Sequence, residues 1–94
     1  MTLDFLIING LVYDGTGNPP VERPVGIKGE RLVLPSQEAK ASQIIDVSGL
    51  AIAPGFIDTH GHSEFTVLAD PRQEGKLYQG ITTEINGNCG LSAA

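Results

Sequence analysis

Cysteine and basic residues are both scarce in this chain of 94 residues, which also lacks tryptophan, and the first two scarcities each argue against a class of protein. The single cysteine, Cys89, cannot form an internal disulfide, which favours a reducing compartment such as the cytoplasm. Six Lys and Arg stand against eleven Asp and Glu, for a net charge of −5, whereas nucleic-acid surfaces need clustered cations. Nucleic acid is therefore not an expected partner.

Long apolar runs are also missing. The opening stretch "MTLDFLIINGL" carries Asp4 where a signal peptide carries positive charge, and its apolar run is shorter than a membrane-spanning helix. These features predict a cytoplasmic protein without a membrane partner.

The first 53 residues are rich in β-forming residues separated by turn signals. Residues 5–13 surround the pair Asn9-Gly10, which predicts two strands joined by a tight hairpin turn. A second hairpin is expected where a strand at 25–28 turns into residues 31–35. Residues 36–43 are polar and predict a loop or one helical turn, and residues 44–54 predict two short strands broken at Ser48-Gly49.

The pattern changes after Pro54. Residues 55–60 form a short apolar strand, and Asp70 and Pro71 are typical of the start of a helix that Gly80 would close. A β-branched strand at 81–85 follows, which completes a parallel strand-helix-strand unit. The sequence therefore predicts two parts, residues 1–54 and residues 55–94.

A parallel strand-helix-strand unit needs further strands and helices to cover both of its faces, and the sequence supplies none after residue 94. We therefore expect a truncated fold, the amino-terminal part of a longer protein. Its uncovered strand edges would favour self-association. A self-sufficient small β domain is the alternative.

Two histidines follow the strand at 55–60 in the sequence "APGFIDTHGHSEF". Side chains two residues apart in extended chain point the same way, so His60 and His62 can present two imidazoles to one ion. Imidazole suits zinc and neighbouring transition metals, and barrel enzymes keep catalytic groups at the carboxyl ends of parallel strands. A bare His-x-His pair also occurs in ordinary turns, and two ligands do not complete a zinc site.

Cys89 follows the second parallel strand. If the two strands are neighbours, their carboxyl ends come within about 5–10 Å, which brings the thiol within reach of the histidines. Thiolate and imidazole are both zinc ligands. The alternatives for a lone cysteine are a small buried apolar residue or a nucleophile, although no nucleophile elbow surrounds it.

Weaker candidates lie beside these three residues. Asp58 either orients an imidazole or ends the strand in a turn, and Glu64 either touches a ligand or is a solvated loop carboxylate. Residues 86–88, Asn-Gly-Asn, are expected to build the turn that directs Cys89, since Asn and Gly tolerate positive φ.

Two longer stretches carry a family resemblance. "IAPGFIDTHGHSE" (Ile52–Glu64) resembles the start of the barrel in the amidohydrolase superfamily, where a strand ends in a metal-binding His-x-His. "GITTEINGNCGLS" (Gly80–Ser92) is similar to the pattern G-[IV]-T-T-x-x-x-G-N-C-G-x-S of its D-aminoacylase branch, the N-acyl-D-amino-acid deacylases. The opening "FLIINGLVYDGTGNPP" (Phe5–Pro20) looks like the family's amino-terminal strands.

This resemblance implies a fold class: the β-rich amino-terminal part of a small β-sandwich in residues 1–54, then the first β-α-β unit of a metal-dependent (β/α)8 TIM barrel in residues 55–94. It also implies that His60, His62 and Cys89 are ligands of one or two Zn²⁺ ions. In the family a metal-activated water attacks the amide carbonyl and a late aspartate acts as general base. That aspartate and the further histidines have no counterpart here, so the chain alone is expected to be inactive.

The function that the resemblance implies is hydrolysis of the amide of N-acyl-D-amino acids, which makes a small N-acyl amino acid the expected substrate. A cyclic-amide hydrolase of the hydantoinase or dihydroorotase type is an alternative that shares the His-x-His strand, although those enzymes use a carboxylated lysine rather than the cysteine of "GNCG". A non-catalytic β module with a vestigial histidine pair is the alternative from another class.

Overall fold

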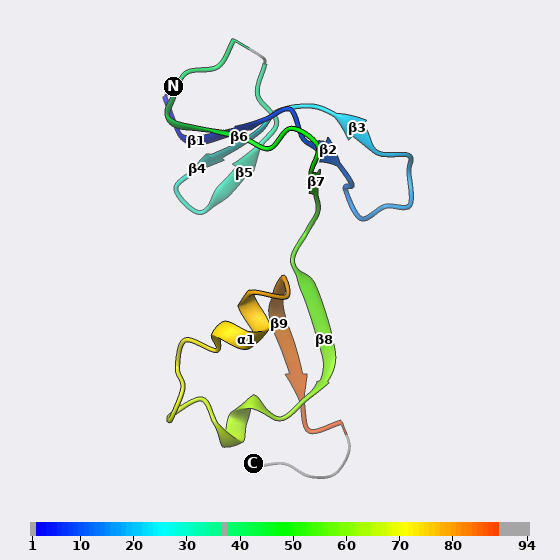
Figure 1. Ribbon diagram of the computed structural model, residues 1–94, viewed down its shortest axis with the longest axis vertical. Coiled ribbons are helices and arrows are strands. Elements are labelled where there is room, and N and C mark those ends of the chain that lie inside the picture. Colours follow the sequence, from blue (N-terminus) through cyan, green and yellow to red (C-terminus); the bar gives the residue numbers. More distant parts are fainter. Residues whose placement is uncertain (1, 37, 89–94) are drawn as a thin grey trace. The chain divides into compact units, whose positions relative to one another are not determined.

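Two compact units, Met1–Pro54 and Gly55–Ala94, make up the chain in the computed structural model, which describes residues 2–36 and 38–88 (Figure 1). The first unit contains β1 (Leu3–Ile8), β2 (Leu11–Val12), β3 (Val21–Glu22), β4 (Val25–Lys28), β5 (Arg31–Val33), β6 (Ala41–Asp46) and β7 (Ala51–Ile52). The second contains β8 (Phe56–Gly61), the 3₁₀ helix η1 (Ser63–Phe65), α1 (Glu74–Leu77) and β9 (Ile81–Asn86). The expected strand-rich character is confirmed.

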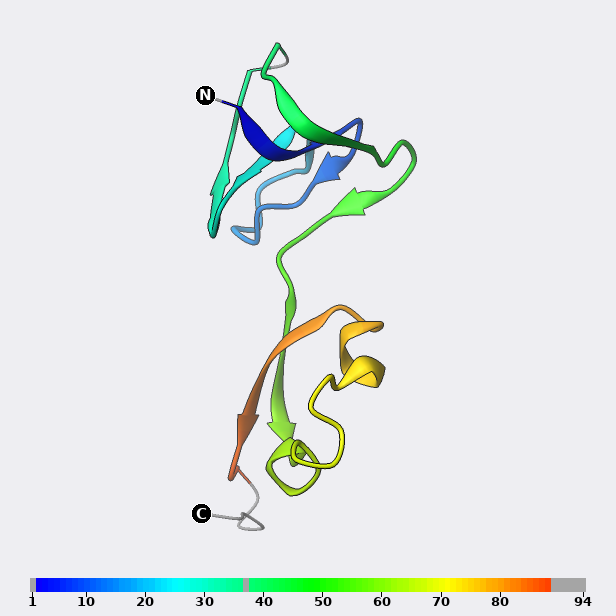
Figure 2. The ribbon, with the colours of Figure 1, turned by 90° about the vertical axis from the view of Figure 1, so that its left-hand side faces the viewer.

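The larger sheet of the first unit has the strand order β5-β4-β1-β6 (Figure 2). Its central strand β1 pairs antiparallel with β4 and parallel with β6. Leu3 and Leu6 on β1 and Val25 on β4 are the buried aliphatic residues, with exposures of 1%, 3% and 7%. The apolar centre of this unit therefore lies where β1 meets its neighbours.

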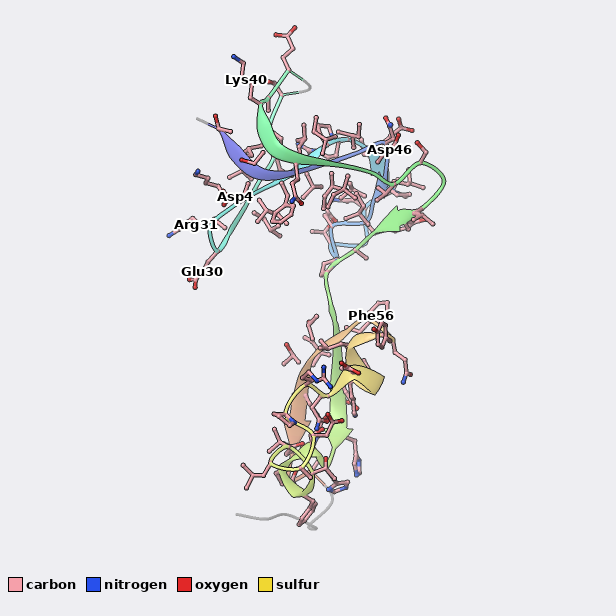
Figure 3. The ribbon with its side chains drawn as sticks, turned by 60° about the vertical axis from the view of Figure 1, so that its left-hand side comes forward. Asp4, Glu30, Arg31, Lys40, Asp46 and Phe56 are labelled. Carbon is pink, nitrogen blue, oxygen red and sulfur yellow. The ribbon has the colours of Figure 1, made fainter. Side chains whose placement is uncertain are left out.

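The predicted hairpin between β4 and β5 is confirmed. Lys28 lies opposite Arg31, and Gly29 between them has a φ of +58°, which suits a glycine in a tight turn. The carboxylate of Asp4 accepts the Gly29 N–H at 2.7 Å and so ties the turn to β1. Figure 3 labels Asp4, and also Arg31 with its neighbour Glu30 at the end of this hairpin.

The hairpin predicted at Asn9-Gly10 is wrong. β1 and β2 lie in different sheets, since β2 pairs with β3 and β7 in a three-stranded sheet of order β3-β2-β7. Asn9 adopts a φ of +65° and its amide donates to Asp46 at 3.2 Å, so the pair turns a corner instead of reversing the chain. Long-range ladders of β1 with β6 and of β2 with β7 take the hydrogen bonds that a local hairpin would have used.

Strand β6 begins at Ala41, inside the stretch predicted as a loop or helical turn, because its parallel register with β1 already starts at Leu3 opposite Ala41. The break predicted at Ser48-Gly49 is confirmed. Both the backbone N–H and the hydroxyl of Ser48 donate to the carboxylate of Asp46, at 3.0 and 2.6 Å. This side-chain turn separates β6 from β7.

The second unit contains the predicted parallel pair. β8 and β9 run side by side in the same direction, with α1 against β9 (Figures 1 and 2). The helix is shorter than predicted, because Asp70 and Pro71 are not helical and α1 begins only after Gln73, whose φ is +47°. Gly75 lowers the helical propensity of this stretch, which is consistent with a single turn.

Over residues 2–36 and 38–88, none of the helices has the length and apolar character that crossing a bilayer requires.

Candidate metal centre

The two histidines lie together at the carboxyl end of β8. His60 is in the strand, and His62 directly precedes η1 after Gly61. Their ring centroids are 5.6 Å apart at an interplanar angle of 71°. Two imidazoles on one tetrahedral zinc, with N–Zn bonds of about 2.0 Å, place their centroids about 5 Å apart. The chemistry and spacing of this pair therefore fit a shared zinc ion.

The third predicted ligand, Cys89, lies outside the described residues. The chain just before it is tied to β8, since the side-chain amide of Asn88 donates to the carbonyl of Thr59, the residue before His60. Gly87 has a φ of +82°, in agreement with the turn expected there. Residue 88 is thus held beside the histidine strand.

Within the described part of the chain, no three His, Cys, Asp or Glu side chains are grouped so that they could hold a metal ion. Two imidazoles alone leave two positions of a tetrahedral zinc site to be filled.

Asp58 takes part in this region through the backbone of His60. Its Oδ1 accepts the His60 N–H at 3.1 Å, and its Oδ2 contacts the ammonium of Lys76. The ion pair with Lys76, followed by the bond from His60, lowers the pKa of Asp58 below its usual 3.8. The carboxylate thus stays ionised and fixes the main chain beside the first imidazole.

Glu84, on β9 directly opposite Asp58, plays the matching part after the second imidazole. Its carboxylate accepts the backbone N–H of Ser63 at 2.8 Å and the Ser63 hydroxyl at 2.7 Å, and its Oε2 lies 3.0 Å from the Lys76 ammonium. These bonds, those from Ser63 first, lower the pKa of Glu84. The pKa of Lys76 is raised, chiefly by Asp58 and then by Glu84.

Glu64 is not the solvated carboxylate that one interpretation of the sequence expected. Its side chain is only 17% exposed, and Oε1 lies 3.8 Å from Nδ1 of His62. Both carboxylate oxygens are buried without a hydrogen bond from the described residues. Phe65 lies near the same imidazole, with ring centroids 6.1 Å apart, so η1 brings one carboxylate and one aromatic ring close to His62.

Lys76, Glu84 and Ser63 are residues that sequence reasoning missed. The strand "ITTEIN" did contain a signal, because an acid in the middle of a β-branched strand needs a partner if the strand is covered. Lys76 gave no such signal, since a lysine on a short polar helix is ordinarily solvated.

Comparisons with known proteins assign the chain to a family. Residues 43–94 match the amidohydrolase family. The chain is 45% identical to an N-acyl-D-glutamate deacylase and 39% identical to a D-aminoacylase, both of Alcaligenes xylosoxydans xylosoxydans, over 98% and 97% of its length. In each case the match covers 19% of the relative, so the chain spans about a fifth of the length of these curated relatives.

A solved structure gives the same result in three dimensions. The N-acyl-D-glutamate deacylase of Bordetella bronchiseptica, crystallised with zinc and a phosphonate inhibitor that mimics the tetrahedral intermediate, matches with a TM-score of 0.91 at 41% identity. The match covers 100% of this chain and 20% of that one. Because the family match spans residues 43–94, more than half of the sequence, this chain belongs to the amidohydrolase family.

Proposed function

We propose that this chain supplies the first metal ligands of a zinc-dependent deacylase that hydrolyses the amide bond of N-acyl-D-amino acids. The observation that carries the proposal is the approach of the His60 and His62 rings to 5.6 Å at the end of β8. The proposed reaction, hydrolysis of an N-acyl-D-amino acid rather than of a cyclic amide, is supported by relatives named N-acyl-D-glutamate deacylase and D-aminoacylase.

The proposed architecture has two parts. Residues 55–94 would provide the first strand-helix-strand of a (β/α)8 barrel, because parallel β8 and β9 joined through α1 are its repeating unit. Residues 1–54, with their two small sheets, would belong to a β-sandwich. The carboxyl end of β8, where the histidines lie, is the end of a barrel strand that carries active-site residues.

The proposed ligands are His60, His62 and Cys89. Neutral imidazoles and a thiolate are a donor set that zinc prefers, and Asn88 holds the chain next to the cysteine against β8. Zinc in such a site supplies a Lewis acid for the amide carbonyl and lowers the pKa of a water molecule. Whether the site takes one ion or two depends on ligands beyond these three residues.

The described side chains have their own tasks in this reaction. Asp58 and Glu84 fix the main chain on both sides of the imidazoles. Glu64 and Phe65 contribute one carboxylate and one aromatic ring beside His62. The substrate would be a small N-acyl-D-amino acid, and the general base would come from elsewhere in the enzyme.

The test uses the complete protein that carries these residues. We expect about one or two zinc ions per chain and turnover of N-acetyl-D-glutamate in preference to its L enantiomer. His60→Ala, His62→Ala and Cys89→Ala should each lose zinc and turnover together, whereas Thr59→Ala, on the other face of the same strand, should keep both. Absence of zinc from the unmodified protein, or turnover by the 94-residue chain alone, would contradict the proposal.

A further inference from the structure

Lys76 connects three elements of the second unit. From α1 its ammonium contacts Asp58 on β8 and lies 3.0 Å from Glu84 on β9. The three side chains are 34%, 24% and 13% exposed, so the cluster is largely shielded from solvent. Asp58 and Glu84 are direct partners in the strand register, and two carboxylates in that position repel each other without a cation between them.

The two carboxylates hold opposite ends of the histidine segment. Asp58 accepts the backbone N–H of His60, at the start, and Glu84 accepts both the backbone N–H and the hydroxyl of Ser63, directly after His62. The main chain is therefore fixed at each end of the residues that carry the imidazoles.

The middle of the segment lies against the same cluster. Gly61 is buried, and a Cβ built on it would be 2.2 Å from Cδ of Glu84. Only a glycine lets the main chain between the histidines approach the Glu84 side chain this closely. The position of Glu84 thus sets the path of the backbone from His60 to Ser63.

We propose that Lys76 is a positioning residue for the metal centre: by joining Asp58 to Glu84, it holds both ends of the His60–His62 segment so that the two imidazoles converge. This proposal rests on the proposed function and adds to it a residue that touches neither metal nor substrate. Mutation of a group that orients a metal ligand typically costs about 10–100-fold in metal affinity, which sets the scale expected for Lys76.

The experiment measures zinc affinity of the complete protein by competition with a chelator. Lys76→Met, which keeps an unbranched side chain one atom shorter and removes its charge, should weaken zinc binding by about 10–100-fold. Lys76→Arg retains a cation between the carboxylates and should recover most of the affinity. Arg72→Met is the matched control, because Arg72 pairs with Glu74 in the same segment but is 80% exposed, and it should leave zinc affinity unchanged.

A second readout follows the ligands themselves. In the cobalt-substituted protein, Lys76→Met should alter the visible absorption bands, which report ligand geometry, whereas Arg72→Met should not. If Lys76→Met does not fold, Glu84→Gln provides the test, since it keeps the side-chain shape but leaves one acceptor oxygen for the two Ser63 donors and removes the ion pair with Lys76, and it should also reduce zinc affinity.

Two failures can be told apart. If the unmodified protein binds zinc and folded Lys76→Met, or Glu84→Gln in its place, binds it equally well with the same cobalt spectrum, the positioning role is wrong and the proposed function stands. If the unmodified protein binds no zinc, the proposed function fails, and the positioning role fails with it.

Discussion

Each of the two units of this chain is stabilised internally by a different kind of contact. The first unit buries aliphatic side chains, Leu3, Leu6 and Val25, between paired strands. In the described part of the second unit the buried residue is Gly61, and the contacts at its centre are ionic, through Lys76, Asp58 and Glu84. Large apolar residues there, such as Phe56 and Ile57, are each 61% exposed.

The difference shows how stability and function are divided along the sequence. Burial of aliphatic carbon is non-directional and tolerates small shifts, whereas ion pairs and charge-assisted hydrogen bonds fix positions and angles. The unit that carries the histidines is stabilised by ion pairs and charge-assisted hydrogen bonds. The unit without candidate ligands among its described residues is stabilised by burial of aliphatic side chains.

The largest effect is expected in the first unit. Leu6→Ala removes a side chain that is 3% exposed, and the cavity should cost about 2–5 kcal/mol of unfolding free energy. Residue-resolved amide hydrogen exchange should show faster exchange in β1 and β4 but unchanged exchange in β8 and β9. Leu32→Ala is the control, since Leu32 is 74% exposed and should change stability little. Equal loss of protection from hydrogen exchange in both units would contradict the difference in how the two units are stabilised.

An intermediate effect is expected from pH on the second unit of the metal-free chain. The pKa values of Asp58 and Glu84 are lowered from 3.8 and 4.5, so their contribution is present above these values and lost as pH falls through the lowered ones. The pKa of Lys76 is raised from 10.5, so its contribution is present below pH 10.5 and lost as pH rises through the raised value.

Methyl NMR signals can follow both limits. The methyl groups of Ile57 and Ile85 in the second unit should report loss of structure in strong acid and in strong base. Leu6 should report no basic limit from Lys76. Acid should still affect the first unit, since turn hydrogen bonds lower the pKa of Asp14 and Asp46. The basic limit of Ile57 and Ile85 should disappear in Lys76→Met, and a limit that persists there would belong to another group.

The smallest effect is expected for the exposed ion pair of the second unit. Arg72 lies 3.2 Å from Glu74, with side chains 80% and 50% exposed, so water and salt screen the pair. Arg72→Ala should change the unfolding free energy by about 0–1 kcal/mol in chemical denaturation. A loss comparable to that of Leu6→Ala would mean that exposure does not separate structural ion pairs from incidental ones in this unit.

Sequence reasoning predicted the elements whose hydrogen-bond partners are close in sequence or follow from a repeated pattern. The β4–β5 hairpin and the parallel pair of β8 and β9 are of this kind. It failed at Asn9-Gly10, where the local turn signal is overruled by pairing with residues 41–46 and 51–52. It also failed at Asp70-Pro71, where the two residues are typical of a helix start but the helix begins after Gln73.

In the candidate site, too, local geometry could be predicted from the sequence and long-range pairing could not. The spacing of His60 and His62 is sufficient to predict that their rings approach, because alternation along extended chain is local geometry. The supporting cluster was not predictable, because it depends on which residue of β9 lies opposite Asp58. A register shift of one residue in β9 would have turned Glu84 away.

The pairing of β1 with β6 also bears on the order in which the chain folds during synthesis. β1 is synthesised before its parallel partner, which lies about forty residues later in the chain, and contacts of such separation form slowly. Until residues 41–46 leave the ribosome, β1 can pair only with β4 and keeps one edge open to other chains. The hydrogen bond from Asn9 to Asp46 at the corner likewise has to wait for the synthesis of Asp46.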